Sequence, residues 1–345
     1  MYKFAIVGLG RIGKSLFWII DENKDFEVSL IVDINNSVKN ILYILNYDST
    51  YQRNKERFIL KNGKIYDSLN HRNIEYLSTD SIKNIKHKSH NINFLIISSG
   101  IKLKNSELNF LKKQKYKTFI TNSDVENIPH YVFGVNDRNI SKKEKIVSTS
   151  ICDSVAISPI IKIFKKFDII SGSITTVHPL LNYQSALDSK SASWSVPGEI
   201  HGHFELGRGF LNNIIPKPTS ALKAVEKVLN LTLSKKISTF SYRIPTTIIG
   251  SADITLIVKK DISLKIIKEE VDKLNKNEKV IMLNSNPLTS LDFIGNEYNC
   301  VLDLRWLRII RKDGIYLIKI ILWYDNEYGY SQNLIKIIKR NILNI

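Results

Sequence analysis

Through the first half of the chain, apolar runs of strand length alternate with amphipathic stretches of helical period. Residues 3–10 are an apolar run that ends in glycine, residues 11–23 repeat apolar positions with helical spacing, and residues 27–35 are β-branched and end in polar turn residues. The same order of strand, helix and strand returns further on, at 92–100, 104–115 and 117–123. Continuous apolar strands that alternate with helices predict a parallel, doubly wound sheet.

The pattern changes after about residue 150, where long strand-like segments stand among amphipathic helices. The segment 304–325 predicts two strands joined at Lys312-Asp313-Gly314, a turn signal for antiparallel pairing. The chain is therefore predicted to be of the α/β class, with a doubly wound domain over 1–151 and an α+β domain over 152–329. Further strands are expected at 171–180 and 239–260, and helices at 154–167, 219–230, 264–275 and 331–343.

The composition indicates the environment in which these domains fold. The chain has 345 residues, and 43% apolar against 24% charged residues is ordinary for a globular protein with sizeable cores. No apolar run approaches the roughly 20 residues of a membrane helix, and we expect no signal peptide. The two cysteines stand in no disulfide framework and in no metal-ligand spacing, so we expect a cytoplasmic protein without a membrane partner or a metal site.

A formal net charge of +17 raises the alternative of a nucleic-acid partner. The lysines are scattered, however, and no aromatic-interleaved basic stripe is present; the chain is also rich in Lys, Ile and Asn together. We therefore interpret the charge as a solvated surface under compositional bias, and nucleic acid is not the expected partner.

A glycine-rich loop follows the first expected strand and opens the first expected helix. Gly8 would allow a tight turn, Gly10 a close approach to a pyrophosphate, and Gly13 close packing of helix on strand. The N–H groups at the helix start, including those of Arg11 and Ile12, favour phosphate charge. Asp33 ends the next strand, where a carboxylate binds ribose hydroxyls, and no arginine follows it directly, so the predicted cofactor is NAD rather than NADP.

Cys152 stands just before an amphipathic run, at the expected start of a helix. The macrodipole and the unpaired N–H groups of a first turn lower a thiol pKa and can stabilise an oxyanion. His178 ends an expected strand, and an imidazole there could hold the thiolate as an ion pair and later accept a proton. Most isolated cysteines and histidines are structural, so a buried thiol and a buried imidazole remain the alternative.

Several further segments resemble one family. In chain order they are GLGRIG, YDST, VSTS shortly before Cys152, TTVH, NIIPKPTSALKAVEKVL, RIPT, DITLIVKKDIS and WYDNEYGYS. In order and spacing they resemble the glyceraldehyde-3-phosphate dehydrogenases, to which erythrose-4-phosphate dehydrogenase is closely related, over nearly the whole chain. The resemblance implies a Rossmann domain, a catalytic domain with a mixed sheet, a C-terminal helix at about 330–345 that packs back on the first domain, and a homotetramer.

The resemblance also implies roles for individual residues. Cys152 would be the nucleophile and His178 its base, and Asn326 would orient the nicotinamide with Tyr330 beside it. The remaining assignments are Ser99 and Thr121 to the NAD site, and Ser150, Arg208, Thr219 and Arg243 to substrate and phosphate. Cys300 is expected to be structural.

The implied chemistry is oxidation of a phosphorylated sugar aldehyde by NAD. The thiolate attacks the aldehyde carbon, His178 removes the hydroxyl proton as hydride leaves, and phosphate or water then attacks the thioester.

Around the nucleophile this chain departs from the family's pattern S-N-A-S-C-T-T-N. Ile151 replaces a serine whose hydroxyl would help to hold phosphate, and Val155 replaces a side-chain amide. Asp153 places an anion beside the thiol, which opposes its ionisation and repels phosphate. Leu181, Leu206 and Ser220 stand at other phosphate-binding or neighbouring positions of the family.

The chain is also longer than the family between Gln184 and Arg208, where it adds Trp194, His201 and His203. The two histidines are expected to be ordinary loop residues rather than a metal pair. The departures leave three alternatives open: a glyceraldehyde-3-phosphate-like substrate with phosphorolysis, erythrose-4-phosphate or another sugar aldehyde with hydrolysis, and a catalytically impaired basic scaffold or RNA-binding homologue.

Overall fold

The computed structural model describes residues 1–35, 37–51, 53–54, 56–86, 90–100, 102–121, 127–191, 203–276 and 278–343. The chain forms two compact units. The first unit comprises residues 1–128 and 141–149, and the second unit comprises residues 129–140 and 150–345. The predicted first domain, 1–151, includes residues 129–140, which this division counts with the second unit, and the predicted boundary after residue 151 stays a prediction. The last helix is counted with the second unit, and its predicted packing on the first domain stays a prediction.

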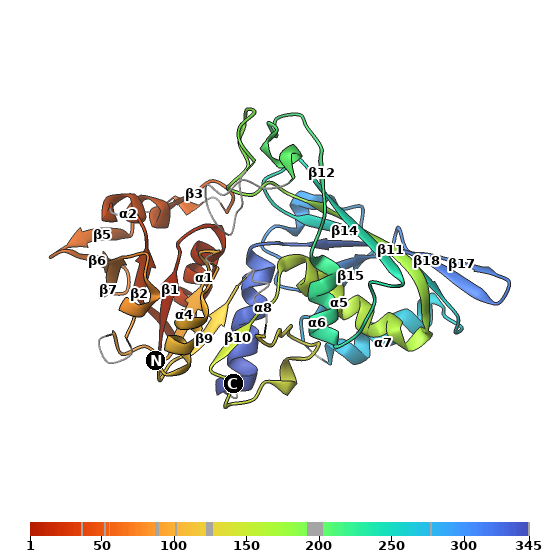
Figure 1. Ribbon diagram of the computed structural model, residues 1–345, viewed down its shortest axis with the longest axis horizontal. Helices are drawn as coiled ribbons and strands as arrows, with labels where there is room; N and C mark the ends of the chain where they lie inside the picture. Colours follow the sequence, from red (N-terminus) through yellow and green to blue (C-terminus); the bar gives the residue numbers. More distant parts are fainter. Residues whose placement is uncertain are drawn as a thin grey trace. The chain divides into compact units, whose positions relative to one another are not determined.

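The first unit is built on a sheet with the strand order β10-β9-β8-β1-β2-β7-β6-β5 (Figure 1). The pairs from β10 to β7 are parallel, as the continuous apolar strands predict, and β6 and β5 add an antiparallel hairpin at one side. The strands are β1 (Tyr2–Val7), β2 (Phe26–Asp33), β5 (Phe58–Lys61), β6 (Lys64–Asp67), β7 (Arg72–Ser78), β8 (Phe94–Ile97), β9 (Lys117–Ile120) and β10 (Ile146–Ser148), with β3 (Tyr47–Asp48) and β4 (Arg53–Asn54) as a separate pair.

The helices of the first unit bury one apolar face each. They are α1 (Arg11–Asp21), α2 (Val38–Asn46) and α4 (Asn105–Lys112), with a short 3₁₀ turn at Ile82–Asn84. In α1, Leu16, Phe17 and Ile20 are fully buried at helical spacing. Burying each such side chain stabilises the unit by about 1.5–3 kcal/mol.

A buried ionic cluster ties the β5–β7 extension to α1. Arg57 donates to Asp21 (Nη1 to Oδ2, 2.6 Å) and to Asp67 (Nε to Oδ1, 2.6 Å), and Arg72 pairs with both carboxylates as well. Burial acts to raise the pKa of Asp67, but the Arg57 guanidinium outweighs it and the pKa is lowered. The Asp67 carboxylate therefore depends on Arg57 to stay charged in the interior.

The second unit is built on a mixed sheet with the order β12-β13-β11-β14-β18-β16-β15, and β17 pairs with β18 (Figure 1). β11–β13 and β15–β16 are parallel and the other pairs are antiparallel. The strands are β11 (Ile169–His178), β12 (Ile215–Lys217), β13 (Ile237–Arg243), β14 (Gly250–Val258), β15 (Ile281–Asn284), β16 (Cys300–Asp303), β17 (Arg308–Lys312) and β18 (Ile315–Tyr324). This architecture confirms the predicted fold class.

One strand prediction is confirmed and another covers two strands. The turn at Asp313 and Gly314 joins β17 to β18 with positive φ at both residues, as the turn signal requires. The segment 239–260, in contrast, contains parts of two strands, because the chain leaves β13 at Arg243 and starts β14 at Gly250.

Helix α5 (Cys152–Phe164) is the central helix of the second unit. It contacts the sheet at β14, β16 and β18 and packs against α6 (Ala221–Leu229), α7 (Leu264–Asn275) and α8 (Tyr328–Ile338) (Figure 1). Nearly all of its residues are buried, so the sheet and the other helices fix its position and that of its first residue. Short turns complete the unit at Asp137–Asn139, Lys165–Phe167, Phe204–Gly207 and Ser290–Phe293, and a π turn at Lys339–Leu343.

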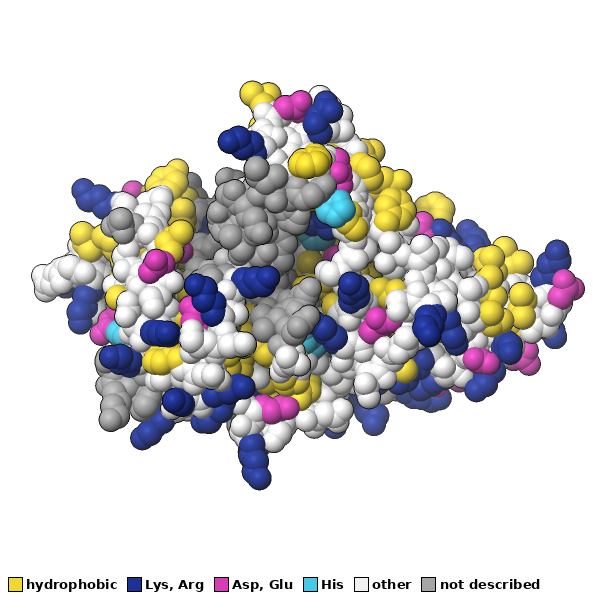
Figure 2. Space-filling view, viewed as in Figure 1, with side chains coloured by type: hydrophobic (Ala, Val, Ile, Leu, Met, Phe, Trp, Pro, Cys, Tyr) yellow, Lys and Arg dark blue, Asp and Glu magenta, His cyan; other side chains and the backbone are white. Residues whose placement is uncertain are grey.

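The exposed surface carries the excess of basic side chains. Figure 2 shows Lys and Arg dispersed over the visible face with Asp and Glu among them, which fits the interpretation of a solvated basic surface. In the part of the chain that is described, no helix combines the length and apolar character that crossing a membrane requires.

Candidate active site

The glycine loop of the first unit has the geometry that its sequence predicts. Gly8 has a φ of +87°, and a Cβ there would lie 2.6 Å from Cα of Ser99. A Cβ on Gly13 would lie 1.9 Å from the carbonyl oxygen of Gly8, so only glycine permits this packing of α1 on the loop. A Cβ on Gly10 would meet no atom within 4 Å, so the loop backbone is open to a ligand at that residue.

The carboxyl ends of three parallel strands place the other predicted cofactor residues at one edge of the sheet. Asp33, at the end of β2, accepts from the N–H of Leu9 in the loop (2.9 Å). Thr121, after β9, is buried and donates to the carbonyl of Ile97 (3.3 Å). Ser99, after β8, has a buried Oγ without a hydrogen-bond partner among the described residues. An unpartnered hydroxyl beside an open glycine loop fits the binding of a dinucleotide at this edge.

The side chain of Arg11 contacts the protein itself. Its Nη1 lies 3.3 Å from Oδ2 of Asp48, and Lys14 pairs with the same carboxylate. Burial acts to raise the pKa of Asp48, but Lys14 and the N–H of Tyr51 outweigh it and the pKa is lowered. The ion pairs thus hold the first turn of α1 against β3, and Arg11 and Ile12 offer a ligand the N–H groups of that turn.

The second unit brings Cys152 and His178 together. Cys152 is the first residue of α5 and is partly exposed, and His178 is the last residue of β11 and is buried. The Sγ atom lies 3.4 Å from Nε2 of the imidazole. The other ring nitrogen, Nδ1, lies 2.7 Å from the carbonyl oxygen of Pro179, which can only accept, so Nδ1 carries the hydrogen and Nε2 presents its lone pair to the thiol.

Asp153 adds a carboxylate to this pair. Its Oδ1 lies 3.6 Å from Sγ of Cys152 and 3.9 Å from Nε2 of His178. The hydroxyl of Tyr324, at the end of β18, donates to the same oxygen over 2.7 Å. Tyr324 can lie there because Gly250, its neighbour on β14, has no Cβ; one placed there would come within 2.4 Å of the tyrosine ring.

Cys152, Asp153 and His178 form a cluster whose electrostatics differ from what the sequence predicts. Burial, and next the charge of Asp153, raise the pKa of Cys152 well above its ordinary value. Burial, and next the charge of Arg243, lower the pKa of His178 to about 4. Desolvation and the charge of Asp153 thus oppose the lowering of the thiol pKa that the helix start was expected to cause. The ion pair of thiolate and imidazolium stays a prediction, and Nε2 of the imidazole can accept the thiol proton.

Two cations lie beside this cluster. Arg243 ends β13, is directly opposite His178 in the strand register, and is buried with an Nε that has no hydrogen-bond partner among the described residues. Lys217 ends β12 on the same face, opposite Ser241. Burial, and next Arg243, lower the pKa of Lys217 to about 8, while Asp153 and Cys152 act against this shift. This face of the mixed sheet therefore offers positive charge to an anionic group of a substrate.

Asn326 and Tyr330 support the backbone around the cluster. Oδ1 of Asn326 accepts from the N–H of Ile249 (3.0 Å), which fixes the orientation of its amide. The Tyr330 hydroxyl donates to the carbonyl of Ser150 (2.9 Å), a residue with a φ of +61° two positions before the nucleophile. Ser150 itself is fully buried, with its Oγ 3.4 Å from Nδ1 of His130, so its predicted contact with substrate gains no support.

The other predicted anion-binding residues lie on loops. Thr219 is half-buried, and its Oγ1 accepts from the N–H of Ala221 at the start of α6 (3.1 Å). Arg208 is exposed and pairs with Asp188 (3.1 Å). His203 lies 3.4 Å from Glu205, whereas Trp194 and His201 lie outside the described residues. The roles predicted for Thr219 and Arg208 stay predictions.

Sequence reasoning missed three groups of this cluster. The Pro179 carbonyl sets the tautomer of His178, Tyr324 anchors Asp153, and Lys217 adds a cation. Only Lys217 could have been found from the sequence, because it stands two residues before Thr219 in the segment NIIPKPTSALKAVEKVL, which resembles the family. The other two depend on contacts across the sheet.

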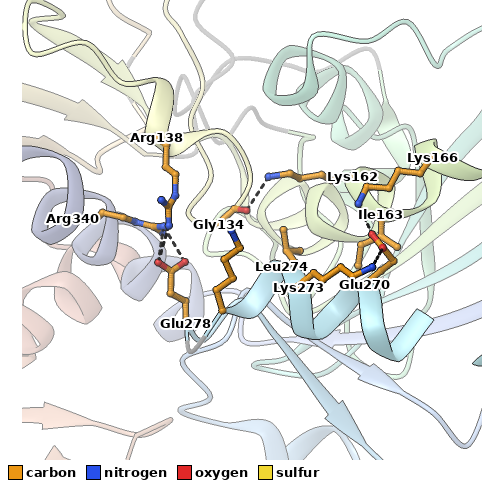
Figure 3. Close-up of a pocket in the computed structure, with 11 residues that line it drawn as sticks. Gly134, Arg138, Lys162, Ile163, Lys166, Glu270, Lys273, Leu274, Glu278 and Arg340 are labelled. Atoms are coloured by element: carbon orange, nitrogen blue, oxygen red, sulfur yellow. Dashed lines mark hydrogen bonds and ion pairs between the residues drawn. The ribbon is translucent and has the colours of Figure 1, made fainter. Parts of the chain in front are cut away.

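A pocket of about 330 Å³ lies at the other end of α5, with cations predominant among its lining residues (Figure 3). Lys166 and Lys273 converge there on Glu270, and Arg340 donates to Glu278 (2.8 Å). Lys162 and Cys152 are ten residues apart on one helix, which corresponds to about 15 Å. The pocket is therefore separate from the thiol, and acidic groups offset part of its charge.

Comparisons with known proteins match both units. Residues 2–105 match the family model described as glyceraldehyde 3-phosphate dehydrogenase, NAD binding domain, and residues 151–326 match the one described as glyceraldehyde 3-phosphate dehydrogenase, C-terminal domain. A protein named glyceraldehyde-3-phosphate dehydrogenase from Buchnera aphidicola subsp. Schizaphis graminum is 32% identical over 98% of both chains. One named glyceraldehyde-3-phosphate dehydrogenase 1 from Kluyveromyces lactis is 30% identical over 98% of this chain and 99% of its own.

These matches, with the two-unit fold, confirm the predicted family, the predicted cofactor NAD and the predicted enzyme class, an NAD-dependent dehydrogenase. The chain belongs to the glyceraldehyde-3-phosphate dehydrogenase family.

Proposed function

We propose that this enzyme oxidises a phosphorylated sugar aldehyde, glyceraldehyde-3-phosphate-like in its chemistry, through a covalent intermediate on Cys152. The observation that carries the proposal is the 3.4 Å approach of Sγ to the unprotonated Nε2 of His178 at the first residue of α5. Arg243 and Lys217 support an anionic substrate, since both place positive charge on the face that holds this pair.

The residues of the chain account for the proton movements. As Sγ forms a bond to the aldehyde carbon, the thiol proton passes to Nε2 of His178 and from there to the former carbonyl oxygen, which gives a thiohemiacetal. NAD, when bound, supplies the hydride acceptor for the carbon of this intermediate. His178 then holds the proton of the hydroxyl group, while the Pro179 carbonyl keeps the hydrogen of Nδ1 in place.

The release of the thioester has two candidate nucleophiles. Phosphate attack would give an acyl phosphate, and water attack would give the free acid; either breaks the carbon–sulfur bond and returns the thiol. Asp153 Oδ1, 3.6 Å from Sγ, favours water, because a carboxylate repels the phosphate dianion and not a water molecule. Erythrose-4-phosphate or another sugar aldehyde with hydrolytic release is therefore our second candidate.

The test measures NADH formation by the purified protein with glyceraldehyde-3-phosphate and erythrose-4-phosphate, each with and without inorganic phosphate. Turnover that requires phosphate supports phosphorolysis, and turnover independent of phosphate supports hydrolysis. Cys152→Ser should abolish NADH formation with every aldehyde, and Cys300→Ser serves as the matched control. NADH formation that survives in Cys152→Ser would refute the covalent route.

A homotetramer, which family membership supports, and a cytoplasmic location, which the use of cysteine supports, complete the proposal. Sedimentation of the purified protein tests the first and fractionation of the source cells tests the second. A basic scaffold or RNA-binding role is the competing hypothesis; it requires tight RNA binding at physiological salt together with an inactive thiol.

A further inference from the structure

Three side chains of different chemistry converge at the start of α5. The donor atoms Sγ of Cys152, Oδ1 of Asp153 and Nε2 of His178 lie within 4.8 Å of one another. Their pairwise separations are 3.4 Å for sulfur to nitrogen, 3.6 Å for sulfur to oxygen and 3.9 Å for nitrogen to oxygen. Thiolate, imidazole and carboxylate are the ligands that Zn²⁺ takes in proteins.

These separations match those of a metal centre. With bonds of about 2.3 Å to sulfur and about 2.0–2.1 Å to nitrogen and oxygen, a tetrahedral zinc ion holds its ligand atoms about 3.3–3.6 Å apart. Two of the three observed separations already lie in this range, and Nε2 and Oδ1 need to approach by a few tenths of an ångström. A change of that size is within reach of small side-chain rotations.

The surroundings hold two of the three donors in orientation. Nδ1 of His178 donates to the Pro179 carbonyl, which leaves Nε2 as the donor atom, and Tyr324 donates to the carboxylate of Asp153. Outer hydrogen bonds of this kind orient the ligands of natural zinc sites. From this arrangement we infer that Cys152, Asp153 and His178 form a binding site for Zn²⁺ that, when occupied, holds the dehydrogenase inactive.

Charge balance permits such a site despite the neighbouring cations. Binding forms a zinc–sulfur bond and breaks the S–H bond, and the proton leaves to solvent. The thiolate and the carboxylate then neutralise the dication, so the occupied centre beside Arg243 and Lys217 carries no net charge. Asp153 is essential to this balance, and the resembling family has a threonine at its position, so the inference concerns this chain.

Inactivation follows because the metal would occupy the nucleophile and its base together. This part of the inference rests on the proposed function, whereas the binding of the metal does not. The thiolate lone pair and Nε2 would both be engaged, so neither carbon–sulfur bond formation nor proton transfer could start. Chelation of the metal would restore both groups.

The test titrates the full-length protein with ZnCl₂ by calorimetry in two buffers of different ionisation enthalpy, and with CoCl₂ while the thiolate-to-cobalt charge-transfer absorption is followed. We expect one ion per chain and about one proton released per ion. Asp153→Asn and Asp153→Thr should each weaken binding by at least about 10-fold. Asp253→Asn, which removes an equal charge from a residue that pairs with Lys319, is the matched control. Thermal melting of every variant verifies that it is folded.

Several outcomes overturn the site: no binding, binding that Cys152→Ser leaves unchanged, or binding that both Asp153 variants retain at full strength. Zinc that binds as expected without inhibiting NADH formation overturns the inactivating role. If cobalt shows the thiolate absorption and the expected variant pattern but no aldehyde is oxidised, the metal site stands and the proposed function fails. EDTA should restore the activity of a zinc-inhibited sample.

Discussion

Replacing Asp153 by asparagine isolates the carboxylate's effect on the reactive thiol. The substitution keeps the size of the side chain and removes its charge. Because burial and the Asp153 charge both raise the pKa of Cys152, removal of the charge takes away one of the two and the pKa should fall. The thiolate population at neutral pH should therefore rise.

The distance sets the magnitude. Oδ1 and Sγ are 3.6 Å apart; at such a separation two unit charges repel by about 1 kcal/mol in bulk water and about 4 kcal/mol at an effective dielectric constant of 20. Cys152 is partly exposed, so solvent screening places the effect in the lower half of this range, at about 1–2 kcal/mol. That energy corresponds to about a 5- to 30-fold increase in thiolate.

The assay follows the rate of alkylation by iodoacetamide as a function of pH. Cys300 is fully buried, and Cys152→Ser gives the blank for any reaction elsewhere. We expect the midpoint of the profile to move to lower pH in Asp153→Asn and to stay in place in Asp253→Asn. An unchanged midpoint, or one that moves to higher pH, would refute the electrostatic argument.

Three further predictions concern the base and the packing. In His178→Asn, NADH formation should fall by at least about 100-fold. In the wild type, kcat/KM should fall at acidic pH with a midpoint near pH 4, where His178 takes up a proton and is lost as a base. A midpoint near 6.5 would contradict this. Gly250→Ala forces a Cβ against the ring of Tyr324 and should cost about 1–3 kcal/mol, measured as a lower Tm, with an unchanged Tm as the contrary result. Arg57→Leu removes one of the two arginines that pair with the buried carboxylates of Asp21 and Asp67 and leaves them only Arg72 among the described residues, which should lower the free energy of unfolding by about 3 kcal/mol. Arg138→Leu, at an exposed ion pair, should change it little.

The parts of the fold that sequence reasoning predicted are those with local causes. Apolar runs predicted β1, β2, β8 and β9, and helical spacing predicted α1 and α5, because both patterns reflect which side of an element is buried. The hairpin of β5 and β6 was not predicted, although its turn at Asn62 and Gly63 has positive φ at both residues and is a local signal for antiparallel pairing. Contacts of Arg57 with Asp21 and Asp67 then hold the hairpin on the first unit.

The candidate site, too, could be predicted only in part from the sequence. The Cys152 and His178 pair could be expected from chain position and resemblance, and the opposition of Asp153 to thiol ionisation from simple charge. The direction of the net pKa shift could not, because desolvation depends on how deeply α5 packs into the second unit. The Tyr324 contact likewise depends on β18 lying beside β14, which no local pattern specifies.

The hydrogen bond from Tyr330 to the carbonyl of Ser150 links the last helix to the turn that begins α5. Ser150 holds a left-handed backbone conformation that a serine adopts only when neighbours impose it. α8 also packs against α5 and buries Leu334, Ile335, Ile337 and Ile338, so a chain cut ahead of α8 would lose both this hydrogen bond and part of the core behind the nucleophile. The last helix is therefore part of what places the sulfur next to its base.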